Sequence, residues 1–132
     1  MKLSVSVPVS LLSLAACVRA GFEATCNDIN ITGTGVITAH CDDGNGSSND
    51  ASLDIKDCYT YYNEELITIG DGHLPDLCRE CSIVMKPGDI WPADVAWVRC
   101  YCQGGWREVN THNEIMNTYG VLECPHARHP VC

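Results

Sequence analysis

The chain has 132 residues, with 17 acidic and 8 basic side chains, so its formal net charge at pH 7 is −9. This acidity argues against nucleic-acid binding, which needs a basic surface, and against charge-driven binding to an anionic membrane. The length suits one domain with a modest core. The ten cysteines would supplement that core with disulfides in an oxidising compartment.

The first 20 residues are typical of a secretory signal peptide. Lys2 supplies a positive start, 5–18 are mostly apolar, and Ala20 ends a sequence suited to cleavage. Cleavage after Ala20 would leave a mature extracellular chain of 21–132. The apolar run is too short to keep that chain in a bilayer.

A second interpretation of the leader stays open. Residues 14–17 read Leu-Ala-Ala-Cys, which resembles a bacterial lipoprotein box. In that case Cys17 would carry lipid and anchor the chain.

The first half of the mature chain predicts short β elements. Apolar and polar side chains alternate within them, and Gly, Asn and Asp separate them. Strands are expected at 22–31, 36–41, 52–55 and 63–69. Turns or loops are expected at 33–35 and 42–50, and a short helical turn at 57–62.

The second half follows the same plan after a link at 69–75. An insertion near 85–93 lengthens its first hairpin and carries Pro87-Gly88 and Trp91-Pro92. Residues 103–108 are correspondingly shorter than their counterpart. A further hairpin is expected at 117–122, where Gly120 suits a turn with positive φ. Many short strands and few helical periodicities predict an all-β domain.

The two halves repeat one pattern, with cysteines, apolar residues and Asp54 or Asn110 recurring in order. This pattern resembles the cyanovirin-N homologues, which are small tandem-repeat lectins. The resemblance also points to a secreted fungal protein. The resemblance implies a pseudo-symmetric fold of two β lobes. Each lobe would take a three-stranded sheet from one copy and a hairpin from the other. The repeats would cover about 22–68 and about 74–124, followed by a tail at 125–132.

The resemblance also bears on cysteine pairing. It implies the bridges Cys26–Cys41 and Cys78–Cys102. Cys81 and Cys100 fall at the positions of Ile29 and Ala39 in the first copy, so a second cross-strand bridge is expected there. Relatives favour Cys58–Cys124, which would leave Cys132 unpaired within the chain. The local pair Cys124–Cys132 is the alternative.

Two other cysteine chemistries are weaker interpretations. Cys78-x-x-Cys81 has redox spacing, but a β-type segment follows it instead of a helix. Together with Cys100-x-Cys102 it could form a four-thiolate zinc site, which secretion disfavours. His126 and His129 show only weak metal spacing. We therefore expect no metal and no cofactor.

Sugar-binding positions can be carried over from the family. In the first lobe they fall on Thr25, Asp42, Gly44, Asn117 and Tyr119. Tyr119 replaces a carboxylate, and Gly21 and Ala24 also depart from the polar residues typical there. In the second lobe the positions fall on Asn63, Asp76 and Gln103. Thr60, Tyr61, His73, Leu77, Gly104 and Gly105 depart around them, so we expect the first lobe to bind better.

Each of these residues also has a structural interpretation. Asp42 would start a turn, Asn117 would cap its hairpin, and Thr25 would be an ordinary strand residue. Trp97 and Trp106 are expected in the core, whereas Trp91 lies in the insertion and is a candidate for exposure. Asn30 and Asn45 satisfy the N-glycosylation pattern, and a glycan on Asn45 would lie beside the first-lobe positions.

Two functions remain open from the sequence. The first is a secreted lectin that binds mannose-rich or related oligosaccharides, free or on glycoproteins, as a monomer or a domain-swapped dimer. The second is a disulfide-rich interaction or effector protein that keeps the fold without binding sugar. An enzyme is not expected, because no motif pairs a nucleophile with a base.

Overall fold

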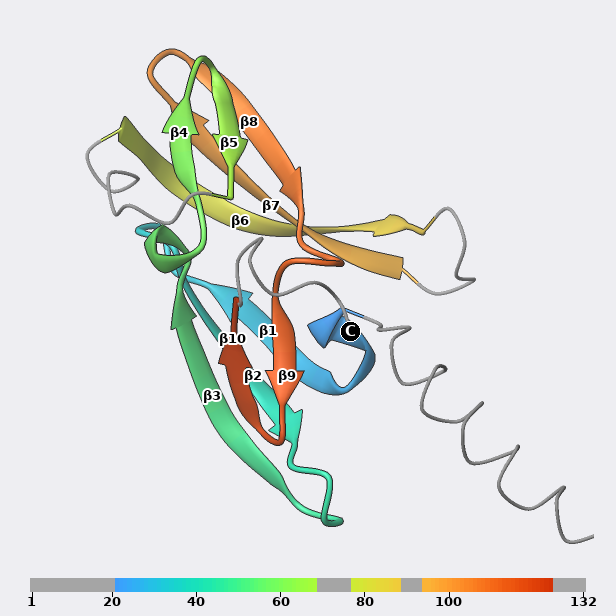
Figure 1. The fold of residues 1–132 in the computed structure, drawn as a ribbon. Helices are drawn as coiled ribbons and strands as arrows, with labels where there is room; N and C mark the ends of the chain where they lie inside the picture. Colours follow the sequence, from blue (N-terminus) through green and yellow to red (C-terminus); the bar gives the residue numbers. More distant parts are fainter. Residues whose placement is uncertain (1–20, 69–76, 89–93, 125–132) are drawn as a thin grey trace, which may run out of the picture.

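The computed structural model describes residues 21–68, 77–88 and 94–124. These residues form ten strands and two single-turn 3-10 helices, and they contain no long helix (Figure 1). The expected all-β class is therefore confirmed. The elements are η1 (Phe22–Ala24), β1 (Cys26–Ile31), β2 (Val36–Asp42), β3 (Ser48–Asp54), η2 (Ile55–Asp57), β4 (Thr60–Tyr62), β5 (Glu65–Ile67), β6 (Cys78–Pro87), β7 (Asp94–Cys102), β8 (Gly105–Asn110), β9 (Met116–Thr118) and β10 (Val121–Glu123).

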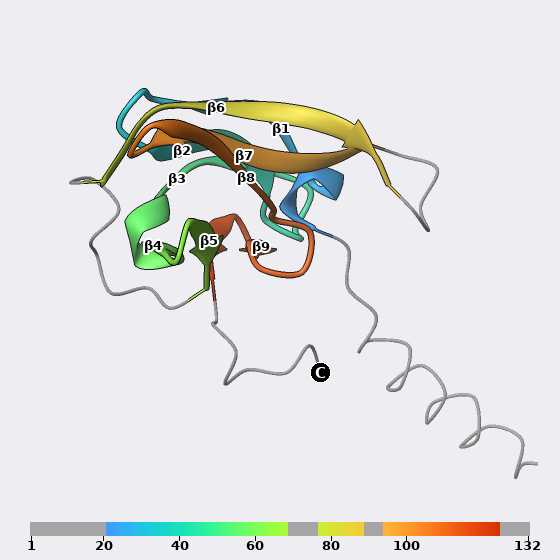
Figure 2. The ribbon, with the colours of Figure 1, turned by 90° about the horizontal axis from the view of Figure 1, so that it is seen from above.

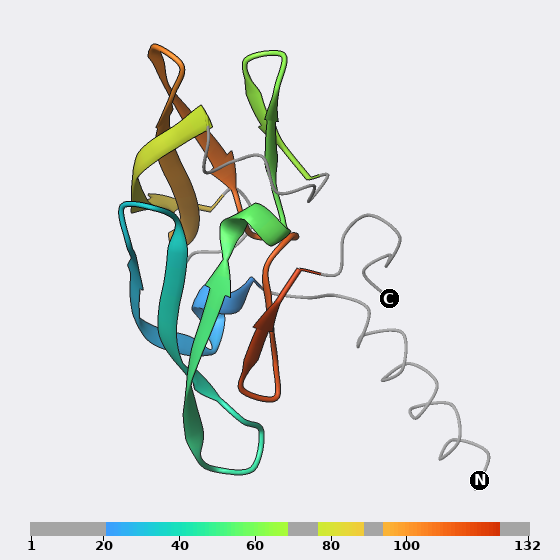
Figure 3. The ribbon, with the colours of Figure 1, turned by 90° about the vertical axis from the view of Figure 1, so that its left-hand side faces the viewer.

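The strands form two lobes that exchange hairpins. The first sheet is β1-β2-β3 and the second is β6-β7-β8, while β4-β5 and β9-β10 are separate two-stranded hairpins. Hairpin β9-β10 contacts β3 of the first copy, and β5 contacts β8 of the second. The two hairpins lie on the same side of the molecule, with the sheets on the other side (Figures 2 and 3). The expected exchange between copies is confirmed.

The two sheets share an irregularity that reflects the repeat. Cys26 pairs with Cys41, and the register then shifts between Asn27 and Asn30. In the second sheet Cys78 pairs with Cys102, and the register shifts between Arg79 and Ser82. One residue in each shift has positive φ: Asp28 at 53° and Glu80 at 56°. The copies therefore match in backbone bulge as well as in strand order.

Alternation along the strands places the core. In β2 the side chains of Ile37, Ala39 and Cys41 are buried, and those between them are more exposed. The same period-two pattern buries Val98, Cys100 and Cys102 in β7. Each sheet therefore turns one face to the core and leaves the other face outside.

A close approach joins the lobes at Gly35. Its φ is +99°, and a Cβ on this residue would lie 2.8 Å from Cγ1 of Ile55. The Ile55 N–H donates to the Gly35 carbonyl at 2.9 Å, and the Cys81 N–H donates to Gly33 at 3.3 Å. Only glycine fits both the backbone conformation and the space at position 35.

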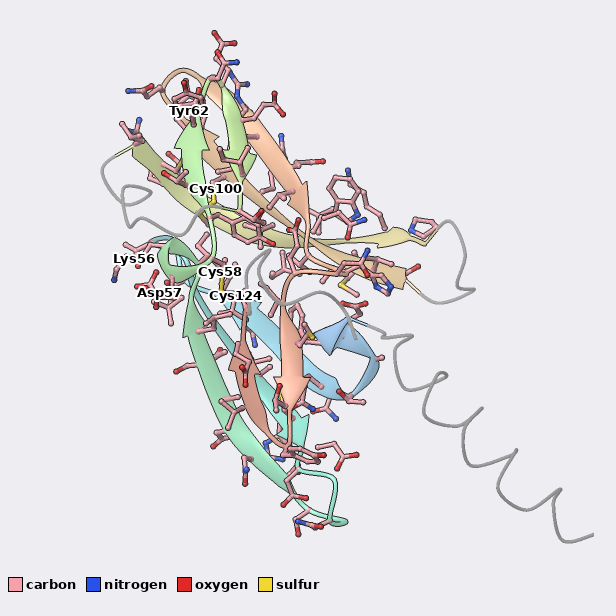
Figure 4. The ribbon with its side chains drawn as sticks, in the orientation of Figure 1. Lys56, Asp57, Cys58, Tyr62, Cys100 and Cys124 are labelled. Atoms are coloured by element: carbon pink, nitrogen blue, oxygen red, sulfur yellow. A yellow bond between two sulfur atoms is a disulfide. The ribbon has the colours of Figure 1, made fainter. Side chains whose placement is uncertain are left out.

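Four disulfides are formed among the described cysteines: Cys26–Cys41, Cys58–Cys124, Cys78–Cys102 and Cys81–Cys100. These are the pairs expected from the repeat and the family resemblance. The bridge from Cys58 to Cys124 joins the two copies (Figure 4). It excludes the alternative pairing of Cys124 with Cys132. The redox and zinc interpretations of Cys78 and Cys81 are also wrong, because both thiols are in other bridges.

Several boundaries differ from the sequence prediction. The helical turn lies at Ile55–Asp57 instead of 57–62, because the Asp54 carboxylate accepts a 3.1 Å hydrogen bond from the Lys56 N–H and starts the turn earlier. Thr60–Tyr62 is then free to form β4. The predicted loop at 42–50 is shorter, since β2 and β3 pair out to Asp42 and Ser48. Residues 22–24 form η1 instead of the start of a strand.

Candidate functional site

A shallow pocket of about 300 Å³ opens on the first lobe. Its lining residues come from three separate parts of the chain: Thr25, Asp42, Gly44, Asn117, Thr118 and Tyr119. All five positions carried over to the first lobe therefore line one pocket. Thr118 was missed, although its place between two chosen residues in the β9-β10 hairpin was a usable signal. The exchange of hairpins is what brings 117–119 beside Thr25 and Asp42.

Asn117 clamps the pocket together. Its Nδ2 donates to Thr25 Oγ1 and to the Asp42 carbonyl, both at 2.9 Å. Its Oδ1 accepts the Gly120 N–H at 2.8 Å. A primary amide has two N–H donors, so these bonds use both of them. Asn117 is thus a positioning residue, and the expectation that it caps its hairpin also holds.

The loop after β2 is fixed by aspartates. Asp42 Oδ1 accepts the Gly44 N–H at 3.0 Å, and Asp43 Oδ1 accepts the N–H groups of Asn45 at 2.7 Å and Ser47 at 3.2 Å. Gly44 has φ +83°, which this turn requires. Within the described residues the second oxygen of Asp42 makes no hydrogen bond. It therefore remains an acceptor on the pocket wall.

Thr25 supplies a donor beside that acceptor. Its hydroxyl oxygen accepts from Asn117, which leaves its own O–H directed elsewhere. The Asp42 N–H donates to the Thr25 carbonyl at 3.0 Å, so the two residues are held side by side. A donor next to an anionic acceptor suits a pair of adjacent hydroxyl groups.

Tyr119 borders the pocket with an exposed ring. Its side chain is among the exposed large ones at 78%, and its φ is 53°. A Cβ on Gly44 would lie 3.2 Å from Tyr119 Cδ1, so the ring lies over Gly44. The aromatic face is consequently available beside the Asp42 and Thr25 oxygens.

The second lobe is built differently. Asn63 and Gln103 both occupy turns with positive φ, at 53° and 44°, and Asp76 lies outside the described residues. The Gln103 N–H donates to Leu77 at 3.2 Å, which matches the bond from Asp42 to Thr25. Tyr61, which is buried, replaces the clamping asparagine, and Leu77 replaces the threonine.

Arg107 lies near the residue that replaces the clamping asparagine. Its guanidinium lies 6.0 Å from the centre of the Tyr61 ring, and its Nη2 is 3.8 Å from Glu64 Oε1. The hairpin β4-β5 is therefore linked to β8 through a cation. The donor and acceptor pair of the first lobe is not reproduced.

The sequence-family model of the CVNH domain matches residues 22–123. The chain belongs to the CVNH family, the cyanovirin-N homologues. No curated protein matches this CVNH chain.

Solved structures of CVNH proteins share its fold. GzCVNH from Gibberella zeae is 18% identical with a TM-score of 0.66, and the match covers 78% of this chain and 95% of GzCVNH. The microvirin–mannobiose complex is 22% identical with a TM-score of 0.56, covering 79% and 97%. A MoCVNH3 variant in complex with (N-GlcNAc)4 is 15% identical with a TM-score of 0.54, covering 81% and 99%.

The first sheet of this CVNH chain carries a hydrogen-bonded side-chain array that was not predicted from the sequence. Ser48 Oγ lies 2.7 Å from His40 Nε2, and His40 Nδ1 lies 2.9 Å from Asp50 Oδ1. The register of β2 and β3 creates it, because His40 pairs with Asp50 across the strands. The Asp50 side chain is 98% exposed, so water screens its effect on the imidazole. A buried carboxylate, which orients the base in serine hydrolases, is missing from this array.

The tryptophans of the second lobe were assigned wrongly. Trp106 is 44% exposed, and Trp97 is only partly buried. A cationic side chain lies over each ring. Arg99 Cζ is 4.3 Å from the centre of the Trp106 ring, and Lys86 Nζ is 4.2 Å from the centre of the Trp97 ring. These rings stand on the outer face of the sheet because the cysteines of β7 take the inward positions. Trp91 lies outside the described residues.

Other site classes find little support in the part of the chain that the structure describes. No three His, Cys, Asp or Glu side chains there are grouped as a metal site. Nor is any helix within 21–68, 77–88 or 94–124 long and apolar enough to cross a bilayer. His126 and His129 lie outside the described residues.

Proposed function

We propose that this protein is a secreted, non-catalytic lectin that binds mannose-rich or related oligosaccharides in the first-lobe pocket. The observation that carries this proposal is the convergence of Thr25, Asp42, Gly44, Asn117 and Tyr119 on one pocket. Family membership supports it as well, because neighbouring CVNH structures are complexes with mannobiose and with (N-GlcNAc)4.

The pocket chemistry suits vicinal hydroxyls. Asp42 accepts hydrogen bonds through its second oxygen, and the Thr25 hydroxyl donates one nearby. A sugar hydroxyl both donates and accepts, so two adjacent hydroxyls can satisfy both groups. The Tyr119 ring would then pack on the sugar face. Because such a pocket buries little apolar area, each site should bind with millimolar to micromolar affinity, about −4 to −8 kcal/mol.

The test begins with a glycan array on the mature chain, followed by calorimetry with the best ligand. Asp42→Asn keeps the bond to Gly44 and removes the charge, so affinity should fall about 10-fold or more, as for a lost charged hydrogen bond. Asp50→Asn is the matched control, since Asp50 is an exposed carboxylate of the same sheet outside the pocket. Equal losses in both variants would contradict the assignment of the pocket.

A second function is favoured by the second lobe. Tyr61 stands where the first lobe has its clamping asparagine, and Arg107 lies near that ring, so the second lobe differs from the first in its polar groups. In this reading the protein is a secreted interaction or effector protein that keeps only the fold. An array without any glycan signal from correctly folded protein would replace the lectin with this alternative.

Two further features bear on binding in the secreted protein. Asn45 is exposed next to Gly44, and a glycan there would screen the pocket. The protein would act as a monomer or as a domain-swapped dimer, because the lobes already exchange hairpins within one chain. Comparing glycosylated and enzymatically deglycosylated protein by calorimetry and size-exclusion chromatography tests both points.

A further inference from the structure

Glu23 holds a buried carboxylate that is incompletely paired. Its side chain is only 7% exposed. Oε2 lies 3.1 Å from Nδ1 of His112, which comes from the second copy. Among the described residues Oε1 has no hydrogen-bond partner. Burying a carboxylate without full pairing is costly, so this oxygen calls for a donor.

Gly21 lies next to this carboxylate. A Cβ on Gly21 would lie 2.6 Å from both Oε1 and Oε2 of Glu23. The nitrogen of a residue is about 2.5 Å from its Cβ, as standard bond lengths and angles require. The Gly21 nitrogen is therefore within about 5 Å of each carboxylate oxygen. Any side chain at position 21 would displace the carboxylate.

Position 21 is fixed by the fold. Gly21 is buried, and Phe22 is fully buried. The Phe22 N–H donates to the Ile115 carbonyl at 3.3 Å, and the Ala24 N–H donates to the Gly21 carbonyl at 3.1 Å. The short η1 turn therefore holds the Gly21 nitrogen beside Glu23.

We infer that removal of the leader after Ala20 creates the missing partner of Glu23. Hydrolysis of the peptide bond between Ala20 and Gly21 consumes one water and leaves a carboxylate on Ala20 and an amine on Gly21. At neutral pH that amine is an ammonium with three donors. The ammonium pairs with Glu23, whose other cationic neighbour is His112 when protonated. Maturation thereby stabilises the first lobe, and this inference rests on the proposed secretion.

The pairing also bears on the sugar pocket. The Thr25 N–H donates to the Phe22 carbonyl at 3.1 Å, so the η1 turn leads directly from Gly21 to the pocket wall. An ordered N-terminus thus holds the Thr25 backbone in place, while Asn117 holds its hydroxyl.

The pairing can be tested with two lengths of chain. One starts at Gly21, prepared with a protease that leaves no extra residue, and the other keeps Ala20. The extra residue moves the ammonium by about 3.8 Å and restores an amide at Gly21. Each length is made with Glu23 and with Glu23→Gln, and with Glu65→Gln as the matched control, an exposed carboxylate of β5. Thermal and denaturant unfolding are then compared.

Retaining Ala20 should lower the melting temperature by about 3–8 °C when Glu23 is present, a shift typical of losing one favourable contact in a domain of this size. In the Glu23→Gln background, retaining Ala20 should change the melting temperature by far less. In the Glu65→Gln background, the difference in melting temperature between the two chain lengths should be as large as in the wild type. Additive effects of Ala20 and Glu23→Gln would overturn the pairing. An extended chain that fails to fold while its Glu23→Gln form folds would support it.

The cleavage point is tested separately, by intact mass of the chain secreted from a eukaryotic host. A mass that starts at Gly21 is expected. Any other start would overturn maturation at Ala20. Neither experiment involves sugar, so a failed lectin and a failed pairing are distinguishable.

Discussion

The hydroxyl of Tyr59 donates a 2.6 Å hydrogen bond to Oε1 of Glu114 and thereby joins the two copies. Tyr59 is fully buried and lies between η2 and β4. Burial raises the pKa of Glu114, and the bond from Tyr59 partly opposes that shift. Burial and the neighbouring carboxylate raise the pKa of Tyr59. The contact therefore couples the junction of the copies to pH.

Glu114 should make stability fall as pH rises. A carboxyl whose pKa is raised in the folded state binds more protons there than when unfolded. Its favourable contribution is complete below the ordinary glutamate pKa of about 4.3 and is lost as pH rises through the folded-state pKa. In Glu114→Gln this decline should vanish from the unfolding free energy measured between pH 3 and 8. A wild-type curve parallel to that of the variant would contradict the prediction.

Tyr59→Phe should strengthen the pH dependence of stability that Glu114→Gln removes. Without the hydroxyl, Glu114 stays partly buried and loses its donor, so its pKa should rise further and the decline with pH should steepen. At neutral pH the variant should lose about 1–3 kcal/mol of stability, the cost of leaving a buried charged acceptor unpaired. Urea unfolding at several pH values checks both expectations.

Features that follow from the repeat and from strand alternation could be predicted from the sequence, whereas features set by tertiary packing could not. The repeat aligned Cys81 and Cys100 with Ile29 and Ala39, and a period of two residues fixes which of them face the core, so the bridges followed. The convergence on the pocket followed from the exchange of hairpins that the family implies. Whether Asn117 faces a ligand or the protein depends instead on distances to Thr25 and the Asp42 carbonyl. Tertiary packing sets those distances, and no sequence pattern states them.

The errors have the same origin. The η2 turn moved because the Asp54 side chain competes for the Lys56 N–H. Trp106 was expected in the core because it lies beside the cysteines of the second copy. It is exposed because it pairs with Tyr101 of β7, which alternates with the buried Cys100 and Cys102, so both rings lie on the outer face of the sheet. Local competition and occupied space decided these positions.

Removing the Cys58–Cys124 bridge should be the most destabilising loss of a disulfide. It closes a loop of 66 positions, against 19 for Cys81–Cys100. The chain-entropy relation gives about 4 kcal/mol for the long loop and about 3 for the short one. The double variant Cys58→Ala with Cys124→Ala tests the first. Cys81→Ile with Cys100→Ala, which copies Ile29 and Ala39, is the control, and it should unfold at the higher denaturant concentration of the two.

Asn117→Asp should separate the clamp from direct sugar contact. An ionised aspartate still accepts the Gly120 N–H but cannot donate to Thr25 Oγ1 or the Asp42 carbonyl, and it would repel the latter. We expect a loss of about 1–3 kcal/mol in stability together with weaker glycan binding. Asp42→Asn should weaken binding with little loss of stability. If Asn117→Asp weakened binding at unchanged stability, Asn117 would be a sugar ligand instead of a clamp.

The array of Ser48, His40 and Asp50 should not act as a nucleophile. Its carboxylate is exposed, so the field that activates a serine in hydrolases is screened by water. A fluorophosphonate probe should label the wild-type protein no more than it labels the Ser48→Ala variant. Stoichiometric labelling that is lost in His40→Ala would show instead that this surface is catalytic.

Tyr119 decides whether the pocket favours a sugar or excludes it. The ring is 78% exposed and lies over Gly44, so it offers a face to a sugar beside Asp42 instead of filling the pocket. Tyr119→Asn suits the positive φ and should leave the fold intact, while glycan affinity falls about 2–10-fold, the usual worth of an aromatic contact. Tyr62→Asn is the matched control, since Tyr62 is 68% exposed in the corresponding hairpin of the second lobe. Calorimetry with the same ligand measures both. Tighter binding in Tyr119→Asn would mean that the ring blocks the pocket, and sugar recognition would then have been lost in the first lobe as well.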